Sequence, residues 1–346
     1  MIFADSLLEE KMTKNQLAKK IATWVVMTVM ISVFLLDIIC VMMCNHYVGE
    51  YVVETEDFSL SNGDDRIHFL NVNNSDAILL ESNGKFALID SGEGDNNPRR
   101  FVAYDGNEAE VIKYLKKVAA DKNGQVVLDF VLGTHNHYDH IGAFEAIIND
   151  SDISAKTAYL KPTDPNIAHD YEIDGWGIQK IYENTVAAFV KDGIKVTDKI
   201  PGEIMFGDFK LTLYNTATDE SLYGQGENAA SVGVLVEKGE RSAFLAADIT
   251  RTSGSEELVI PLLDKVDILK VGHHGYYGST SWSFAKKLDP DIAIITNKLG
   301  KIYPDVKWTL TTICNAAIFA TVDENGIIAT FSDDGQIILT NHAQDL

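Results

Sequence analysis

Residues 134–140 read THNHYDH, so that three histidines and one aspartate fall within six positions. Imidazole and carboxylate groups are the ligands that suit zinc, manganese and iron. The chain has nine histidines, and five of them lie either here or in a second cluster, His273-His274-Gly275. So dense a concentration has little value for packing, and it indicates a metal site.

The cluster follows residues 126–132, an apolar run of the kind that forms a buried strand. His135 and His137 are two apart on an extended segment, so their side chains point to the same side and can hold one ion. Asp139 and His140 follow at the turn into a helix and would serve a second ion. Two ions about 3.5–4 Å apart form a hydrolytic pair.

Two further strand ends supply candidates for the remaining ligands. Asp248 follows the apolar residues 244–247, and it is the candidate for a carboxylate that bridges both ions. His273 and His274 follow the apolar strand 268–271. We expect these strand ends to meet at one edge, with Asp248 bridging, His274 binding the second ion, and His273 contacting substrate or supporting the site.

Strand-rich blocks, each followed by alternating strands and helices, occur twice after residue 63. This order predicts an α/β fold with two central sheets and helices on both outer faces. A helix is expected to begin near Ile141, and further helices are predicted at 107–120, 176–190, 282–288 and 306–319. Predicted strands are 67–72, 76–81, 85–90, 126–132, 203–206, 209–214, 231–237, 243–247, 266–271, 292–296, 327–331 and 336–340.

These residues resemble the metallo-β-lactamase superfamily of hydrolases over roughly residues 66–340. Asp90, within residues 88–92, resembles the aspartate of the first motif, which supports the site from behind. Residues 135–140 resemble the second motif, Asp248 the bridging aspartate, and His273-His274-Gly275 the last motif of one branch. The resemblance implies a four-layered αββα sandwich and a hydrolase with two divalent ions, zinc or else manganese or iron.

Residues 69–77 and the Asn-x-x-Ser segment 228–231 resemble one branch of that superfamily. It contains the hydrolase domain of ComEC-type DNA-uptake proteins and the phosphorylcholine esterases, and the complete second motif favours the esterase comparison. The branch implies a phosphodiesterase or other phosphoesterase acting by a metal-bound hydroxide. The resemblance gives catalytic roles to Asp139, Asp248 and His273, and the candidates for substrate contact are Asn228, Tyr276 and Tyr277.

One departure concerns the third histidine that many members supply to the first ion. The corresponding region holds only His169, which lies too early, so Asp219, Asn228 or water would take that place. A catalytically weak metal-binding recognition module therefore remains an alternative. A ComEC-like nuclease is another, although 51 acidic and 29 basic residues give a formal charge of -22, which disfavours nucleic acid.

We expect the chain to divide into a cytoplasmic tail (1–20), a transmembrane helix (21–44), a linker (45–62) and the hydrolase domain (63–346). The apolar segment is long enough to span a bilayer, and no small-x-small site follows it, which favours an anchor over a cleaved signal peptide. Lysines precede the segment and acids follow it, so the positive-inside rule predicts a single-pass protein of the cell membrane with its catalytic domain outside the cytoplasm.

Asp37 is the only charge within the apolar segment. It is expected to be neutral, to lie near the far interface, or to pair with another helix. The sequence predicts the membrane and a small-molecule or cell-envelope phosphoester as partners, and it predicts no protein partner.

Overall fold

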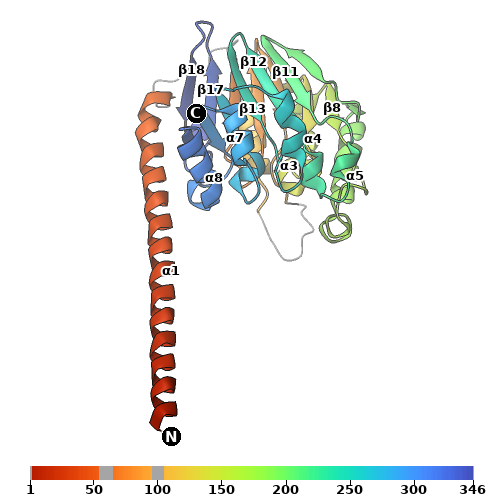
Figure 1. The fold of residues 1–346 in the computed structure, drawn as a ribbon. Coiled ribbons are helices and arrows are strands. Elements are labelled where there is room, and N and C mark those ends of the chain that lie inside the picture. Colours follow the sequence, from red (N-terminus) through yellow and green to blue (C-terminus); the bar gives the residue numbers. More distant parts are fainter. Residues whose placement is uncertain (1, 54–64, 96–104, 346) are drawn as a thin grey trace.

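The computed structural model describes residues 2–53, 65–95 and 105–345. Helix α1 (Ile2–Tyr51) projects away from a body built of sheets and shorter helices (Figure 1). Its segment Gln16–Ile39 has a mean hydropathy of 2.2 and is long and apolar enough to cross a membrane. This segment overlaps the predicted span 21–44.

Residues 45–53 do not form the linker expected from their polar character. Helix α1 continues to Tyr51, and β1 (Val52–Val53) then pairs in parallel with β18 (Ile337–Asn341). Extending a helix costs far less than starting one, and residues 45–51 contain no proline to stop it. Residues 54–62 of the predicted linker lie outside the described part of the chain.

One sheet has nine strands among the described residues, and the four strands at one end of it, β4, β6, β8 and β9, run parallel. A β-hairpin, β3–β4, turns through Asn83 and Gly84, both of which have positive φ. In spatial order the strands are β1, β18, β17 (Ile327–Phe331), β2 (Arg66–Phe69), β3 (Ile78–Ser82), β4 (Lys85–Ile89), β6 (Phe130–Gly133), β8 (Thr157–Leu160) and β9 (Lys195–Thr197).

The other large sheet has seven strands among the described residues, antiparallel from β10 to β13 and parallel from β13 to β16. In order they are β10 (Glu203–Phe206), β11 (Phe209–Tyr214), β12 (Gly233–Lys238), β13 (Arg241–Leu245), β14 (Ile268–Lys270), β15 (Ile292–Ile295) and β16 (Ala317–Ala320). A small separate sheet pairs β5 (Val126–Leu128) with β7 (Ile153–Ala155).

The layers are those of the predicted αββα sandwich, which is confirmed. The central core lies between the two large sheets. A second core packs the outer face of the nine-stranded sheet against α2 (Glu108–Val118), α3 (Tyr138–Ile141), α4 (Phe144–Asn149) and α5 (Ile178–Lys191). A third packs the outer face of the seven-stranded sheet against α6 (Ser255–Val259), α7 (Trp282–Leu288) and α8 (Pro304–Trp308).

Three predicted elements were wrong in detail. The run 126–132 is interrupted at Asp129, so that its two halves, β5 and β6, belong to different sheets. The helix expected from about Ile141 begins earlier: α3 starts at Tyr138, within the histidine cluster. The predicted helix 306–319 stops because Asn315 adopts a positive φ, which ends helices, and the following residues form the buried strand β16.

Helix α1 packs against β16, the edge strand of the seven-stranded sheet, and contacts β18 and the edge strand β1 of the nine-stranded sheet as well as α8. An uncovered edge strand would present unpaired backbone groups to other chains, so this packing protects the sandwich. Asp37 of α1 forms an ion pair with Lys307, whose side chain is buried, at 2.7 Å between Oδ1 and Nζ. Of the three alternatives expected for Asp37, the structure shows pairing with another helix, and that helix is α8.

The central core should be sensitive to the loss of one aromatic ring. Phe209 is fully buried between the sheets, and its ring meets that of Phe331 edge to face at 5.5 Å. We expect Phe209→Ala to lower the free energy of unfolding by about 3–5 kcal/mol, because a cavity replaces the ring. Chemical denaturation of the full chain in detergent measures this, and a loss below about 1 kcal/mol would contradict it. The matched variant Phe209→Leu should cost less than about 1.5 kcal/mol.

Candidate metal centre

Three strand ends bring the predicted ligands to one place between the sheets. The segment after β6 carries the histidine cluster, and Asp248 and His273 follow β13 and β14. Gly133 ends β6, where a Cβ atom would come within 2.8 Å of side chains of Leu160 and Ile141, so only glycine fits there. The nine-stranded sheet thus supplies one half of the centre and the seven-stranded sheet the other.

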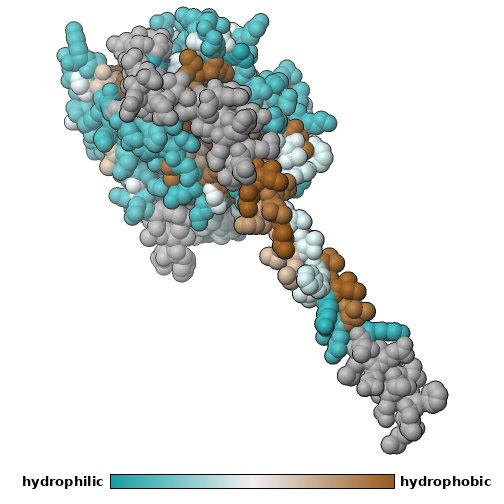
Figure 2. Space-filling model, turned by 90° about the vertical axis from the view of Figure 1, so that its left-hand side faces the viewer, coloured by the Kyte–Doolittle hydropathy of each residue, from teal (hydrophilic) through white to brown (hydrophobic). Residues whose placement is uncertain are grey.

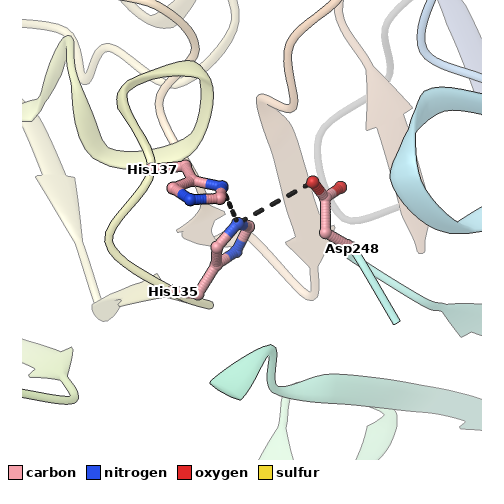
Figure 3. A group of neighbouring side chains, drawn as sticks. All are labelled: His135, His137 and Asp248. Atoms are coloured by element: carbon pink, nitrogen blue, oxygen red, sulfur yellow. Dashed lines mark hydrogen bonds and ion pairs between the residues drawn. The ribbon is translucent and has the colours of Figure 1, made fainter. Parts of the chain in front are cut away.

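The first donor group consists of His135, His137 and Asp248 (Figure 3). His135 Nε2 lies 3.2 Å from His137 Nδ1 and 3.8 Å from Asp248 Oδ2. All three side chains are buried, and they point toward one another from opposite sides of the site. The i, i+2 spacing of the two histidines produces the shared direction that the sequence predicts.

The second donor group consists of Asp139, His140 and His274, with the other oxygen of Asp248 beside it. Asp248 Oδ1 lies 3.2 Å from His140 Nε2 and 3.4 Å from His274 Nε2. His274 Nε2 lies 3.6 Å from Asp139 Oδ2. The carboxylate of Asp248 therefore faces both groups, one oxygen to each.

The unpaired atoms of this centre test whether metal ions fit. Among the described residues, His140 Nε2, His274 Nε2 and Asp248 Oδ1 are buried yet make no hydrogen bond. Such groups are costly unless something pairs with them. Donors held tetrahedrally at about 2.0–2.1 Å from one zinc ion lie roughly 3.3–3.4 Å apart, which is close to the distances found here. The residues therefore fit divalent cations.

The charges of the centre agree with this fit. Four carboxylates, those of Asp76, Asp90, Asp139 and Asp248, surround the histidines, and Lys270 is the buried cation that pairs with one of them. Buried charge of one sign is strongly unfavourable without compensation. Bound cations would remove this surplus of negative charge.

The same contacts shift the pKa values of the ligands. Burial raises the pKa of Asp248, but the neighbouring His140, His274 and His273 outweigh burial and hold the pKa well below its usual value. Burial lowers the pKa of His140, and the charges of Asp248 and Asp90 outweigh this and raise it well above its usual value. Without cations, therefore, protons on His140 and His274, whose pKa values are both raised, balance part of the carboxylate charge.

Asp90 supports His140 from behind, in the position that the first motif implies. Its Oδ2 accepts a hydrogen bond from His140 Nδ1 at 2.7 Å. Thr134 holds the same carboxylate through its backbone N–H and its hydroxyl, both at 2.8 Å. With Nδ1 occupied in this way, His140 presents Nε2 to the second donor group.

The sequence analysis did not identify the support behind His274. Its Nδ1 lies 3.0 Å from the hydroxyl of Thr296, which donates to Asp76 Oδ1 at 2.6 Å. Asp76 also pairs with Lys270, which is fully buried and donates to the carbonyl of Ala247 at 2.9 Å. The signal available in the sequence was Lys270 itself, a lysine in an otherwise apolar strand, three positions before His273.

Glu172 was also missed, and it supports His137. Its Oε1 accepts from His137 Nε2 at 3.1 Å, so Nδ1 of that ring is left to face His135. Glu172 is itself held by the backbone N–H of Glu227 at 3.0 Å. Burial raises the pKa of Glu227 to about 7. No sequence motif marks Glu172, because it lies in an irregular turn (Tyr171–Trp176).

Asp219, one of the two residues considered in place of a third histidine, does not join the first donor group among the described residues, and neither does His169. His169 contacts Glu172 through its backbone N–H, and Asp219 is exposed and caps the turn at Ser221. Asn228 is half-buried, and Ser231 of the same segment lies 3.3 Å from His135 Nδ1. Within the described residues the first group therefore offers three histidine or carboxylate donors.

The predicted substrate contacts lie at different depths. His273 Nε2 is 3.9 Å from Asp248 Oδ2, and its side chain is 30% exposed, so it borders the centre and remains accessible. The ring of Tyr276 lies 5.7 Å from that of His273. Tyr277 is further out, 59% exposed and beside Tyr303. Both His273 and His274 have positive φ, a strained conformation that is frequent at functional sites.

Replacing Lys270 should weaken metal binding although it is no ligand. In Lys270→Met the charge of Asp76 is left buried and unpaired behind His274, which destabilises the centre. We expect metal affinity to fall about 10–100-fold, measured by competition with a chromogenic chelator. Lys210→Met, at an exposed lysine paired with Glu203 and Glu237, is the control and should leave affinity unchanged. Equal affinities in the two variants would contradict this role.

Metal binding should release protons at neutral pH. Burial lowers the pKa of His274, but Asp248 and Asp76 outweigh it and raise the pKa to about 9, so the ion-free ring is protonated at pH 7. A ligand must be neutral, so affinity should increase as pH rises toward about 9. Calorimetric titration in buffers of different ionisation enthalpy counts the protons, and a count of zero would contradict the prediction.

The stability of the ion-free protein should change in the opposite sense. The pKa of His274 is raised above its usual value of 6.5, so its protonated ring adds to the free energy of unfolding, and this contribution is fully present below pH 6.5. It is lost as pH rises through about 9.

Comparison with known proteins agrees with the geometry. A family model described as the metallo-beta-lactamase superfamily matches residues 70–296. ComE operon protein 3 of Bacillus subtilis is 25% identical over 245 residues, 63% of this chain and 29% of that protein. Recombination protein 2 of Haemophilus influenzae is 24% identical over 237 residues, 67% of this chain and 24% of that protein. The chain thus spans less than a third of either relative.

Among solved structures, the metallo-beta-lactamase fold protein YhfI from Bacillus subtilis aligns with a TM-score of 0.45 and 13% identity, over 74% of this chain and 96% of that one. Isothiocyanate hydrolase from Delia radicum gut bacteria aligns with a TM-score of 0.44 and 13% identity, over 75% and 97%. The resemblance that the motifs predict is confirmed by the family model, and the chain belongs to the metallo-β-lactamase superfamily.

Proposed function

We propose that this protein is a membrane-anchored, metal-dependent phosphodiesterase that binds two divalent cations, with zinc the first choice and manganese or iron the alternatives. The observation that carries the proposal is the carboxylate of Asp248, which presents one oxygen to each of two donor groups. Two ions that share a carboxylate can hold both the attacking and the leaving oxygen of a phosphoester.

The reaction is a hydrolysis. Water adds to phosphorus, the bond from phosphorus to the leaving alcohol breaks, and the alcohol takes up a proton. Bound divalent cations would lower the pKa of water and neutralise the negative charge that develops on the phosphoryl and leaving oxygens. Asp139 and Asp248 would hold the cations, and Asp139 would accept a hydrogen bond from the attacking water.

His273 is suited to the leaving side of the substrate. Its Nε2 borders the centre, while its ring stays partly exposed. A hydrogen bond from this ring to the leaving oxygen would stabilise the departing alkoxide. Of the tyrosine candidates for substrate contact, Tyr276 lies nearer and Tyr277 lies further out, and Asn228 is the remaining candidate.

The anchor supports an extracytoplasmic substrate. Lysines precede the apolar segment of α1, and acids follow it, so the catalytic domain would lie outside the cytoplasm. Substrates there would be phosphoesters of the cell envelope or small molecules. Aromatic rings such as Trp176, 5.5 Å from the ring of His137, could contact a quaternary ammonium headgroup.

The second candidate is a nuclease, favoured by the similarity to ComE operon protein 3 and Recombination protein 2. The formal charge of -22 opposes it, because a polyanion would be repelled.

Hydrolysis and metal content of the full chain in detergent test the proposal. We expect bound divalent metal and turnover of bis(4-nitrophenyl) phosphate. Asp248→Asn and His137→Ala should each reduce turnover by more than about a hundredfold, because the stabilisation of the transition-state charge is lost. Colorimetric release of nitrophenol, together with elemental analysis, measures both properties.

Asp219→Asn is the matched control, since this exposed carboxylate only caps a turn, and it should leave turnover unchanged. Turnover that persists in both site variants would rule out the metal mechanism. Bound metal without hydrolysis would support a recognition module instead. Release of phosphorylcholine from its nitrophenyl ester would favour an envelope esterase, whereas cleavage of DNA would favour the nuclease.

A further inference from the structure

An open groove lies between helix α1 and the catalytic body. It has a volume of about 540 Å³, within the range of ligand sites, and the Asp37–Lys307 ion pair lies in its lining. One wall is apolar and belongs to α1: Val29, Met30, Val33 and Phe34. The other wall is the segment from Gly300 to Pro304 together with Lys307.

The apolar wall belongs to the part of α1 that is able to cross a membrane. Val29 lies ten residues before Ile39, the end of that segment, which is about 15 Å along the helix axis. Each of the four apolar side chains is at least half exposed. Figure 2 shows the hydrophobic side chains of α1 beginning where the helix leaves the body. With this segment in a bilayer, the groove would open toward the lipid.

The opposite wall has the composition of a membrane interface. Tyr303 lines the groove and is 42% exposed. The ring of Tyr277, which is 59% exposed, lies 5.9 Å from that of Tyr303, and Trp282, which is 57% exposed, lies 6.2 Å from Trp308 of α8. Tyrosine and tryptophan are enriched at the level of the lipid headgroups. Lys301 also lines the groove, and its positive charge suits the phosphate of a headgroup.

A chain of aromatic rings connects the groove to the metal centre. The ring of Tyr303 lies 6.4 Å from that of Tyr276. Tyr276 in turn lies 5.7 Å from His273 and 6.3 Å from His274. A molecule with its apolar part in the groove could therefore extend its polar end along Tyr276 to the donor groups.

We propose that the groove binds the apolar part of a phospholipid-type substrate taken directly from the bilayer, whose phosphodiester headgroup is hydrolysed at the metal centre. This inference rests on the proposed phosphodiesterase function and specifies its substrate class. The anchor then has two roles, since α1 both holds the enzyme at the membrane and forms one wall of the substrate site.

Two substrates with the same leaving group test this. The full chain, reconstituted in phosphatidylcholine vesicles, is given either phosphatidyl-4-nitrophenol in the bilayer or soluble bis(4-nitrophenyl) phosphate. A Cβ atom at Gly300 meets nothing within 4 Å, so Gly300→Trp fills the groove without a backbone clash. We expect it to slow hydrolysis of the lipid by about tenfold or more while hydrolysis of the soluble diester changes by less than about twofold.

The matched control is Gly202→Trp, because Gly202 has equally open surroundings but does not line the groove. It should change neither rate. Val33→Trp narrows the groove from the other wall and should repeat the effect of Gly300→Trp. Ile31, two positions away on the helix and not in the groove lining, gives the corresponding control, Ile31→Trp.

The outcomes separate this inference from the function on which it rests. Hydrolysis of the soluble diester with no hydrolysis of the lipid, or lipid hydrolysis unaffected by both groove variants, overturns the inference and leaves the phosphodiesterase intact. Failure on both substrates overturns both. If Gly300→Trp instead dissociates a dimer in detergent, the groove holds a second copy of α1 and the lipid assignment is wrong.

Discussion

The carboxylate of Asp248, facing two groups of donors at once, is the feature on which the rest of the site depends. It is buried, it lies among histidines from both halves of the molecule, and one of its oxygens makes no hydrogen bond. Neither donor group takes all of its ligand atoms from one stretch of the chain, because each combines residues 135–140 with Asp248 or His274. The two sheets must therefore pack face to face before the site exists, and the central core that holds them together also fixes the spacing of the ligands.

Three of the donor histidines are each oriented by a partner on the far side of the ring. Asp90 holds His140, Glu172 holds His137, and Thr296 with Asp76 holds His274. Such partners set which ring nitrogen faces the ion and how rigidly it is held. Lys270 compensates the charge of Asp76, so a basic side chain in the middle of a buried strand contributes to a centre that it does not touch.

Helix α1, whose apolar segment is long enough to cross a membrane, is joined to the body by packing contacts rather than by a flexible tether. It packs against the edge strand β16 and against β18 and β1 of the other sheet, and Asp37 pairs with a buried lysine of α8. The orientation of the body relative to the span is then determined by packing. This arrangement places the aromatic rings of Tyr303 and Tyr276 between the apolar wall of α1 and the histidines.

The sequence by itself determined the donor set and its order, because ligand spacing and the ends of apolar strands are local properties. It also determined the αββα layering, since apolar periodicity specifies which faces are buried. Only the tertiary structure showed Glu172, Asp76 and Lys270 as supports, because their roles depend on contacts between distant segments that carry no local pattern. The helix predicted at 306–319 failed for a related reason, since helical and buried-strand patterns look alike over short apolar runs. The partner of Asp37 likewise depended on how α1 packs against the body, which no residue spacing specifies.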